Sequence, residues 1–158
     1  MMNKNSWLLT ILVIVGLTAC ATMQSGVKGP SLPNDINIIP PSPDLSKEIA
    51  VFSGQWAGTW EMGTSVIIAV EEIHDTWGQI VYANGNNPRY NISAGYERLK
   101  AEVIASPKPK IQFSPAVHKS ARGISLGVID SDTLEGIMLF QNQFGDQYSQ
   151  KVIMKRTN

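Results

Sequence analysis

From residue 55 onward, apolar and polar residues alternate with a period of two, the repeat of a β-strand with one buried and one exposed face. Leu99, Ala101 and Val103, which are separated by charged residues, show this pattern clearly. The pattern predicts strands over 55–61, 64–73, 77–83, 95–105, 110–114, 123–130, 133–141 and 147–156. Most connections between them are too short to hold a crossover helix, so neighbouring strands are expected to be antiparallel.

A sheet of sequential antiparallel strands has two open edges, and closure into a barrel removes both. The expected fold class is therefore all-β, an eight-stranded antiparallel up-and-down barrel, with an open, strongly curved sheet as the alternative. The prolines of this region fall between the predicted strands, as the hydrogen bonding of a sheet requires. They are Pro88, Pro107, Pro109 and Pro115.

One short helix is expected before the first strand. Ser42 can cap its start and Pro43 suits the first helical position. Leu45, Ile49 and Phe52 follow at helical spacing and form one apolar stripe, which must pack on another element because so short a helix is unstable alone. We expect this helix to cover one end of the barrel.

The N-terminal region has the pattern of a secretory signal. Lys4 precedes an apolar run of about eleven residues at 7–17, which is shorter than the roughly 20 residues needed to span a bilayer but matches a signal core. The run ends in Leu17-Thr18-Ala19-Cys20, which resembles the lipobox of bacterial lipoproteins. This resemblance implies cleavage between Ala19 and Cys20, diacylglycerol on the Cys20 thiol, and acylation of the new amine by a fatty acid such as palmitate.

The same resemblance gives an expected location and partner. The acyl chains on Cys20 would hold the protein in a membrane, since two or more chains anchor stably where one does not. Ala21 follows the cysteine, where lipoproteins kept in the inner membrane carry Asp. The expectation is therefore a lipid-anchored protein of the cell envelope, in the outer membrane and facing the periplasm or the cell surface.

The domain organisation follows from these segments. Residues 1–19 are the predicted signal peptide, 20–43 a lipidated, flexible, proline-rich tether, and 44–158 the barrel domain. An alternative for 36–39 is that this part of the tether packs on the barrel. The 13 basic and 13 acidic residues cancel, so no nucleic-acid partner is expected, and the single cysteine excludes an internal disulfide.

The start of the first strand resembles a known family of barrels. Gly54-Gln55-Trp56 is similar to the Gly-x-Trp opening of lipocalins and fatty-acid-binding proteins. The resemblance implies that Trp56 closes one end of the barrel beneath a basic residue of the last strand, either Lys155 or Arg156. The second lipocalin motif, Thr-Asp-Tyr, has no counterpart here.

Aromatic residues on the inward faces allow two interpretations. Trp56 and Trp60 share a face of one strand, and further aromatics on apolar faces are Tyr82, Phe113 and Phe140. Either these side chains fill a narrow barrel, or they line a pocket for a small apolar or ring-containing ligand. The long connection at 84–95 adds Tyr90 as a residue of a binding lip.

Arg98 is the remaining candidate for ligand binding. Alternation puts Tyr96, Arg98, Lys100 and Glu102 on the solvent face of their strand. The alternative turns Arg98 inward as the anchor of a ligand carboxylate, at the cost of exposing apolar residues. The candidate ligand-binding residues are thus Trp60, Tyr82, Tyr90 and Arg98.

Signals of catalysis are sparse. Both histidines, His74 and His118, fall in predicted turns, and no spacing indicates a metal site or a cofactor. The chain is expected not to be an enzyme, with an uncharacterised hydrolase as the alternative. The expected function is a lipid-anchored envelope lipoprotein whose barrel binds a small apolar ligand. The alternative is a structural module with a filled barrel that binds an envelope protein partner.

Overall fold

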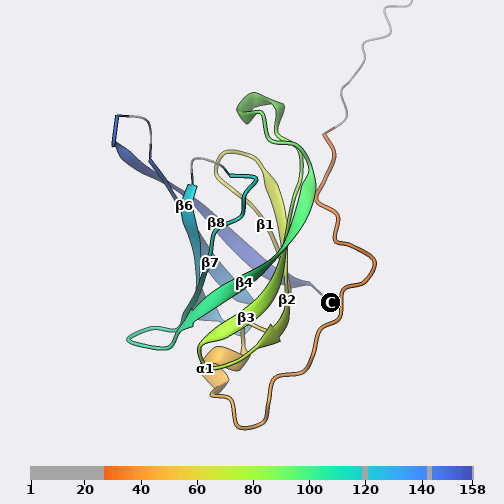
Figure 1. Cartoon of the computed structure of the whole chain (residues 1–158), viewed down its shortest axis with the longest axis vertical. Helices are drawn as coiled ribbons and strands as arrows, with labels where there is room; N and C mark the ends of the chain where they lie inside the picture. The colour runs from red at the N-terminus through yellow and green to blue at the C-terminus, as the bar shows by residue number, and fades with distance from the viewer. Residues whose placement is uncertain (1–26, 119–120, 142–143, 158) are drawn as a thin grey trace, which may run out of the picture.

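The computed structural model describes residues 27–118, 121–141 and 144–157, and shows a closed antiparallel barrel (Figure 1). Each strand pairs with the next, and the last pairs with the first. The strands are β1 Gly54–Thr59, β2 Ser65–Ile73, β3 Trp77–Asn84, β4 Gly95–Ile104, β5 Lys110–Phe113, β6 Ala121–Asp130, β7 Thr133–Gln141 and β8 Gln147–Thr157. The predicted fold class is confirmed, and closure between β1 and β8 excludes the open sheet.

The described residues contain one α-helix, α1 (Lys47–Ala50), which is shorter than the apolar stripe suggested. Ser42 does not cap it, because the chain first makes a turn in which the Leu45 amide donates to the Ser42 carbonyl (3.0 Å). The apolar stripe packs against the barrel as expected, since Ile49 and Phe52 are buried in the core. α1 and the turn after it cover one end of the barrel (Figure 1).

Beneath α1, Trp56 and Arg156 seal that end. Trp56 is completely buried, and its indole N–H donates to the Phe52 carbonyl at 2.8 Å. The Arg156 guanidinium lies 4.1 Å from the centre of the Trp56 ring and donates to the carbonyls of Ser53 and Val51, both at 2.7 Å. Arg156 therefore takes the position of the basic residue over the tryptophan.

Lys155, the other candidate for that position, points elsewhere. Its ammonium group donates to Thr133 Oγ1 at 2.5 Å, across the β7–β8 pair. The two residues point to opposite sides because they are adjacent in a strand, and only Arg156 shares the face of Trp56.

The barrel interior between α1 and the opposite end is packed with side chains. Gly136 on β7 permits this packing, because a Cβ at residue 136 would lie 2.5 Å from Val152 Cγ1 and 2.9 Å from Leu126 Cδ2. The predicted interior aromatics Trp56, Trp60, Tyr82 and Phe113 are buried, and Phe140 is buried close to the end opposite α1. In the packed part of the barrel the filled-barrel interpretation describes the interior.

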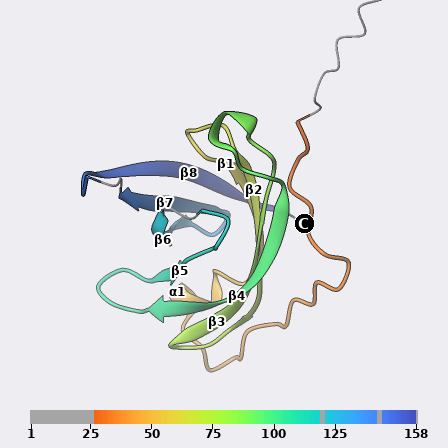
Figure 2. The same ribbon diagram turned by 45° about the horizontal axis from the view of Figure 1, so that its top comes forward.

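Residues 27–43, here called the strap, run along the outside of the barrel towards α1 (Figures 1 and 2). The Ile39 amide donates to the Glu71 carbonyl at 2.7 Å, and Lys28 is hydrogen-bonded to Asn86 at the other end of the strap. Polar groups of β2 and of the loop after β3 thus bond to the strap, and the contact of Ile39 agrees with the alternative in which 36–39 packs on the barrel. The predicted signal peptide, Ala19, Cys20 and residues 21–26 lie outside the described residues.

Within the described part of the chain, the structure contains no helix with the length and apolar character needed to cross a membrane.

Candidate ligand-binding site

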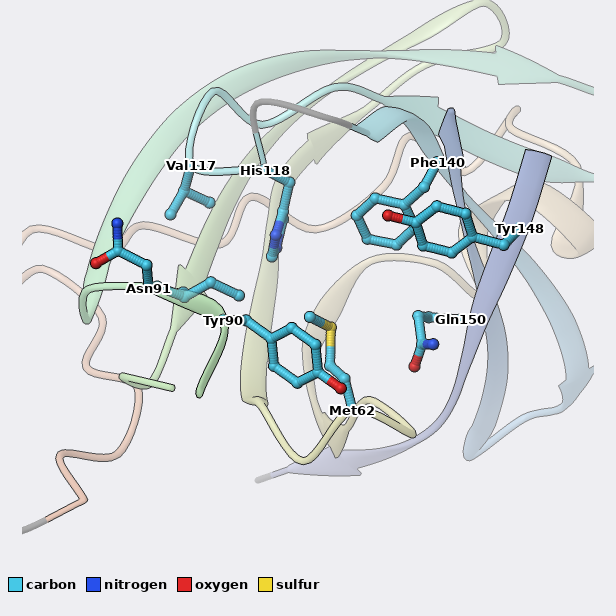
Figure 3. A pocket seen from close by; sticks show the side chains of 9 residues that line it. Met62, Tyr90, Asn91, Val117, His118, Phe140, Tyr148 and Gln150 are labelled. Atoms are coloured by element: carbon cyan, nitrogen blue, oxygen red, sulfur yellow. The ribbon is translucent and has the colours of Figure 1, made fainter. Parts of the chain in front are cut away.

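A cavity of about 320 Å³ opens at the end of the barrel opposite α1, here called the mouth (Figure 3). Its lining residues come from the β1–β2 turn, the loop after β3, the turn after β5, and the paired ends of β7 and β8. They are Met62, Tyr90, Asn91, Ile92, Val117, His118, Phe140, Tyr148 and Gln150. This volume is at the lower end of the range for small-molecule sites.

One wall of the pocket is aromatic. Phe140 and Tyr148 are directly opposite each other on β7 and β8, and their rings stack with centroids 5.0 Å apart and planes 5° apart. Tyr90 lies across the pocket beside Met62 (Figure 3), held in the short 3-10 turn Pro88–Tyr90. These residues offer flat, polarizable surfaces of the kind on which planar rings pack.

A buried hydrogen-bonded chain forms the floor. The Trp60 indole N–H donates to the Tyr82 oxygen at 3.3 Å, and the Tyr82 hydroxyl lies 2.6 Å from His118 Nε2. The Tyr82 oxygen thus accepts from Trp60 and is also hydrogen-bonded to the His118 ring, with the direction of that second bond set by the His118 tautomer.

Glu97 fixes the position of His118. Glu97 is opposite Tyr82 in the β3–β4 pair, and its carboxylate accepts hydrogen bonds from the amides of Ala116 and Val117, both at 2.8 Å. Burial lowers the pKa of His118 below its ordinary value, and the negative charge of Glu97 only partly opposes this shift. Burial likewise raises the pKa of Tyr82, so its hydroxyl stays protonated.

The His118 shift predicts a pH dependence of stability. The unfolded chain takes up a proton on this histidine below about pH 6.5, and the folded chain does so only at lower pH. The stabilising contribution is therefore complete above about pH 7, and is lost as pH falls through 6.5 towards the folded pKa. In urea unfolding between about pH 7.5 and 5, we expect His118→Gln to flatten the decline.

His74→Gln is the matched control for this measurement. His74 lies on the outside of the barrel, hydrogen-bonded to Glu72 at 2.8 Å and stacked on Trp77 at 4.3 Å. An unchanged pH profile in His118→Gln, or the same flattening in both variants, would show that His118 is not the group responsible.

Gln150 provides a hydrogen-bonding atom that is not paired. It faces inward opposite Met138, and its Oε1 is buried without a hydrogen-bond partner among the described residues. A buried polar atom left unpaired costs about 1–3 kcal/mol. A ligand with an N–H or O–H group at this point would recover that loss, so the atom is a specific anchor in a pocket whose lining also includes the polar side chains of Asn91 and His118.

The residues predicted from sequence lie at three different places. Tyr90 lines the pocket, and Trp60 and Tyr82 lie below it, connected to it through His118. Arg98 is on the outer face, where it bonds to Glu71 (2.9 Å) and Asp35. Arg98 is therefore not an anchor inside the barrel, and the alternation that placed it on the outer face is correct.

Several pocket residues were not predicted. Tyr148 and Gln150 continue the inward row of β8 beyond Val152 and Met154, so the alternation there contained a usable signal. His118 lies in a turn, as predicted, but no sequence pattern indicated that this turn folds into the barrel mouth.

The described residues contain no group of three His, Cys, Asp or Glu side chains arranged to hold a metal ion. The fold and site together define a small lipocalin-like barrel, sealed at one end by Trp56 and Arg156 and open at the other as a ligand-sized pocket. No protein-family model matches this sequence, and no curated protein sequence matches it. The likeness to lipocalins therefore rests on the barrel and its sealed end.

Proposed function

We propose that this chain is a lipid-anchored bacterial envelope protein whose barrel mouth binds a small, mainly apolar molecule that contains a ring. The observation that carries the proposal is the mouth pocket of about 320 Å³, where the stacked pair Phe140–Tyr148 lies near the unpaired Oε1 of Gln150. The rings supply affinity for an apolar body, and the amide oxygen selects for a donor group. The lipobox-like Leu17-Thr18-Ala19-Cys20 supports the anchor.

The chemistry of the pocket favours binding over catalysis. The described residues that line it include no carboxylate, no thiol and no serine or threonine hydroxyl. The one imidazole, His118, has its Nε2 committed to the Tyr82 hydroxyl at 2.6 Å, so that nitrogen is not free to take a proton from a substrate. We therefore propose a carrier or sensor rather than an enzyme, with no cofactor required.

A second candidate function is an interaction module of the envelope. The packed interior between α1 and the floor of the pocket favours it, because buried side chains fill that part of the barrel. In this case the mouth pocket would receive a side chain of an envelope protein rather than a free small molecule.

The test uses two probes that differ in one donor. Indole carries an N–H group, and indene is its carbon analogue without one. We expect the protein to bind indole about tenfold more tightly than indene, because only indole can satisfy Gln150 Oε1. Titration followed by two-dimensional amide NMR measures both affinities and locates the pocket through Tyr90 and His118.

The variant Gln150→Met provides a second test, because it should make the protein more stable and its binding of indole weaker. Removing the unpaired amide is expected to raise the free energy of unfolding by about 1 kcal/mol, and to abolish the preference for indole over indene. Native mass spectrometry of protein purified from its host would show whether a molecule occupies the pocket. An empty protein that binds neither probe would reject the carrier and favour the interaction module.

A further inference from the structure

The strap begins at the mouth, where it is paired to the barrel in both directions. The Lys28 amide donates to Asn86 Oδ1 at 2.6 Å, and the Asn86 amide donates to the Lys28 carbonyl at 2.9 Å. Asn86 belongs to the loop after β3 that also carries Tyr90, a wall of the pocket. The chain therefore reaches the folded unit at its open end, not at the sealed end where β1 begins (Figure 1).

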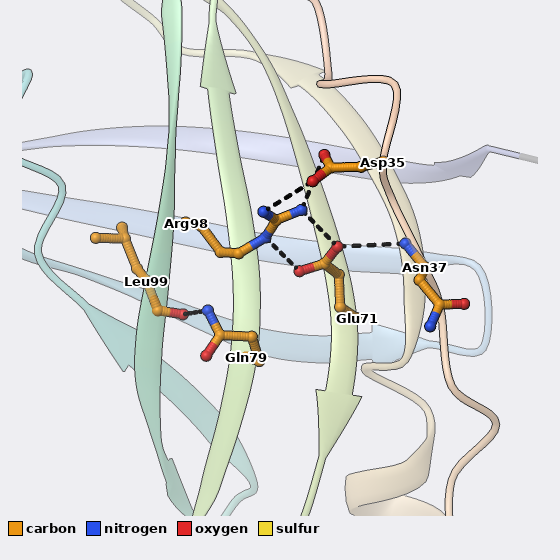
Figure 4. Close-up of polar contacts among 6 residues, drawn as sticks. All are labelled: Asp35, Asn37, Glu71, Gln79, Arg98 and Leu99. Atoms are coloured by element: carbon orange, nitrogen blue, oxygen red, sulfur yellow. Dashed lines mark hydrogen bonds and ion pairs between the residues drawn. The ribbon is translucent and has the colours of Figure 1, made fainter.

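A cluster of charges fixes the middle of the strap (Figure 4). Arg98 donates two hydrogen bonds to Asp35 of the strap (3.2 and 3.3 Å) and two to Glu71 of β2 (2.9 and 3.1 Å). The Glu71 carboxylate also accepts from the Asn37 amide at 3.3 Å. Only 9% of the Glu71 side chain is exposed, so this network is better shielded than an ordinary surface ion pair.

The chain between the predicted lipid attachment and the strap is short. Val27, the first described residue of the strap, is seven positions after Cys20. Even a fully extended chain covers no more than about 25 Å in seven positions, and a random coil of that length spans roughly 15 Å. A lipid on Cys20 would therefore hold the mouth, rather than the sealed end, close to the membrane surface.

Exposed aromatic side chains also gather at the mouth rather than at the sealed end. Among the described residues, the large aromatic side chains that are exposed all lie at the mouth: Tyr90, Tyr96, Phe144 and Tyr148. Phe144, in the β7–β8 hairpin, is 80% exposed. Tyrosines with an apolar ring and a polar tip are enriched where proteins meet the interface of a bilayer.

We propose that these four aromatic residues, here called the rim, dock on the surface of the lipid bilayer, so that the pocket opens towards the membrane. The strap sets this orientation, and the ligand enters from the lipid side. This inference rests on the proposed lipid attachment at Cys20. It adds two points to the proposed function: one surface of the protein faces the membrane, and the ring-containing ligand is a molecule that dissolves in the lipid bilayer.

The experiment compares two labelled positions in the lipidated full chain, purified from host membranes and reconstituted in phosphatidylcholine–phosphatidylglycerol vesicles. Ser93→Cys places a fluorophore beside the mouth, and Ser131→Cys places one in the β6–β7 turn near Arg156, at the sealed end. Lipids with a nitroxide on the headgroup quench only dyes close to them. We expect quenching at position 93 to exceed that at position 131 about threefold or more, because the strap limits the distance of the mouth from the membrane.

A strap-release variant tests the cause. Asp35→Ala with Asn86→Ala removes contacts of the strap but leaves Glu71 paired with Arg98, so the barrel should stay folded, as circular dichroism would check. The backbone bonds from Ile39 to Glu71 and from Asn86 to Lys28 remain in this variant, so the quenching ratio should fall without reaching one. An unchanged ratio would overturn the role of Asp35 and Asn86 in setting the orientation.

The outcomes also separate this inference from the proposed function. In the lipidated protein the Cys20 sulfur is blocked, so mass spectrometry should find one dye per chain. Two dyes per chain would show a free Cys20 thiol, and would reject the anchor and the inference with it. One dye per chain with equal quenching at positions 93 and 131 would reject the membrane-facing mouth and leave the anchor standing.

Discussion

Arg156→Ala is expected to lower the free energy of unfolding by about 3 kcal/mol. The guanidinium donates to the carbonyls of Ser53, Val51 and Ser131, at distances from 2.7 to 3.2 Å, and lies on the Trp56 ring. Its loss removes charge-assisted hydrogen bonds and exposes the Trp56 ring. It also breaks the hydrogen bonds that connect the turn after α1 to β8. Urea unfolding followed by tryptophan fluorescence measures the change.

Two variants control this measurement. Lys155→Ala removes the neighbouring cation, which makes a single bond to Thr133 Oγ1, and should cost about 1 kcal/mol or less. Arg156→Lys keeps the charge but cannot reach several carbonyls at once, so its cost should lie between those of Lys155→Ala and Arg156→Ala. Equal losses in Lys155→Ala and Arg156→Ala would mean that the seal depends on charge in general, not on the guanidinium of Arg156.

The sealed end shows how far the sequence could be interpreted. Gly54-Gln55-Trp56 predicted a tryptophan under a basic residue, and alternation alone could not choose between Lys155 and Arg156, because the register of β8 against β1 was unknown. That register places Arg156 opposite Trp56. The strands were predictable because each depends on a local period of two, whereas the choice of partner depends on closure of the barrel.

The helix and the strap were less predictable, for a related reason. Spacing of Leu45, Ile49 and Phe52 correctly gave the buried face, but packing against the barrel end needs only a single turn of helix at Lys47–Ala50. The proline-rich strap has no periodicity. Its attachment depends on single long-range bonds, such as those from Arg98 to Asp35 across 63 positions of the chain.

The pocket could be predicted only in part. Tyr90 was proposed because it lies in a long loop, and Tyr82 because it lies on an inward face. The pocket combines segments as distant as Met62 and Gln150, and only the closed barrel brings them to one mouth. No local pattern marks Gln150 as unpaired, because that property depends on what the neighbouring strands and turns leave unfilled.

Tyr82→Phe is expected to lower the free energy of unfolding by about 3 kcal/mol, although it removes one oxygen atom and keeps the ring. The hydroxyl accepts from the Trp60 indole N–H and is hydrogen-bonded to His118 Nε2, so its loss leaves two buried nitrogens unpaired. Each unpaired buried group costs about 1–3 kcal/mol. Urea unfolding at about pH 7.5, where His118 is neutral, measures the change.

A double-mutant cycle separates the two nitrogens. In a His118→Leu background the imidazole partner is already absent, so Tyr82→Phe should cost about half as much. The difference between the two costs is the coupling free energy of Tyr82 and His118. Phe113, which packs on Tyr82 with ring centroids 6.0 Å apart, supports the ring in both backgrounds, so the cycle reports on the hydroxyl alone. A cost below about 0.5 kcal/mol for Tyr82→Phe would mean that water from the mouth replaces the hydroxyl. The floor of the pocket would then be wet, and a ligand would meet that water instead of a closed hydrogen-bonded chain.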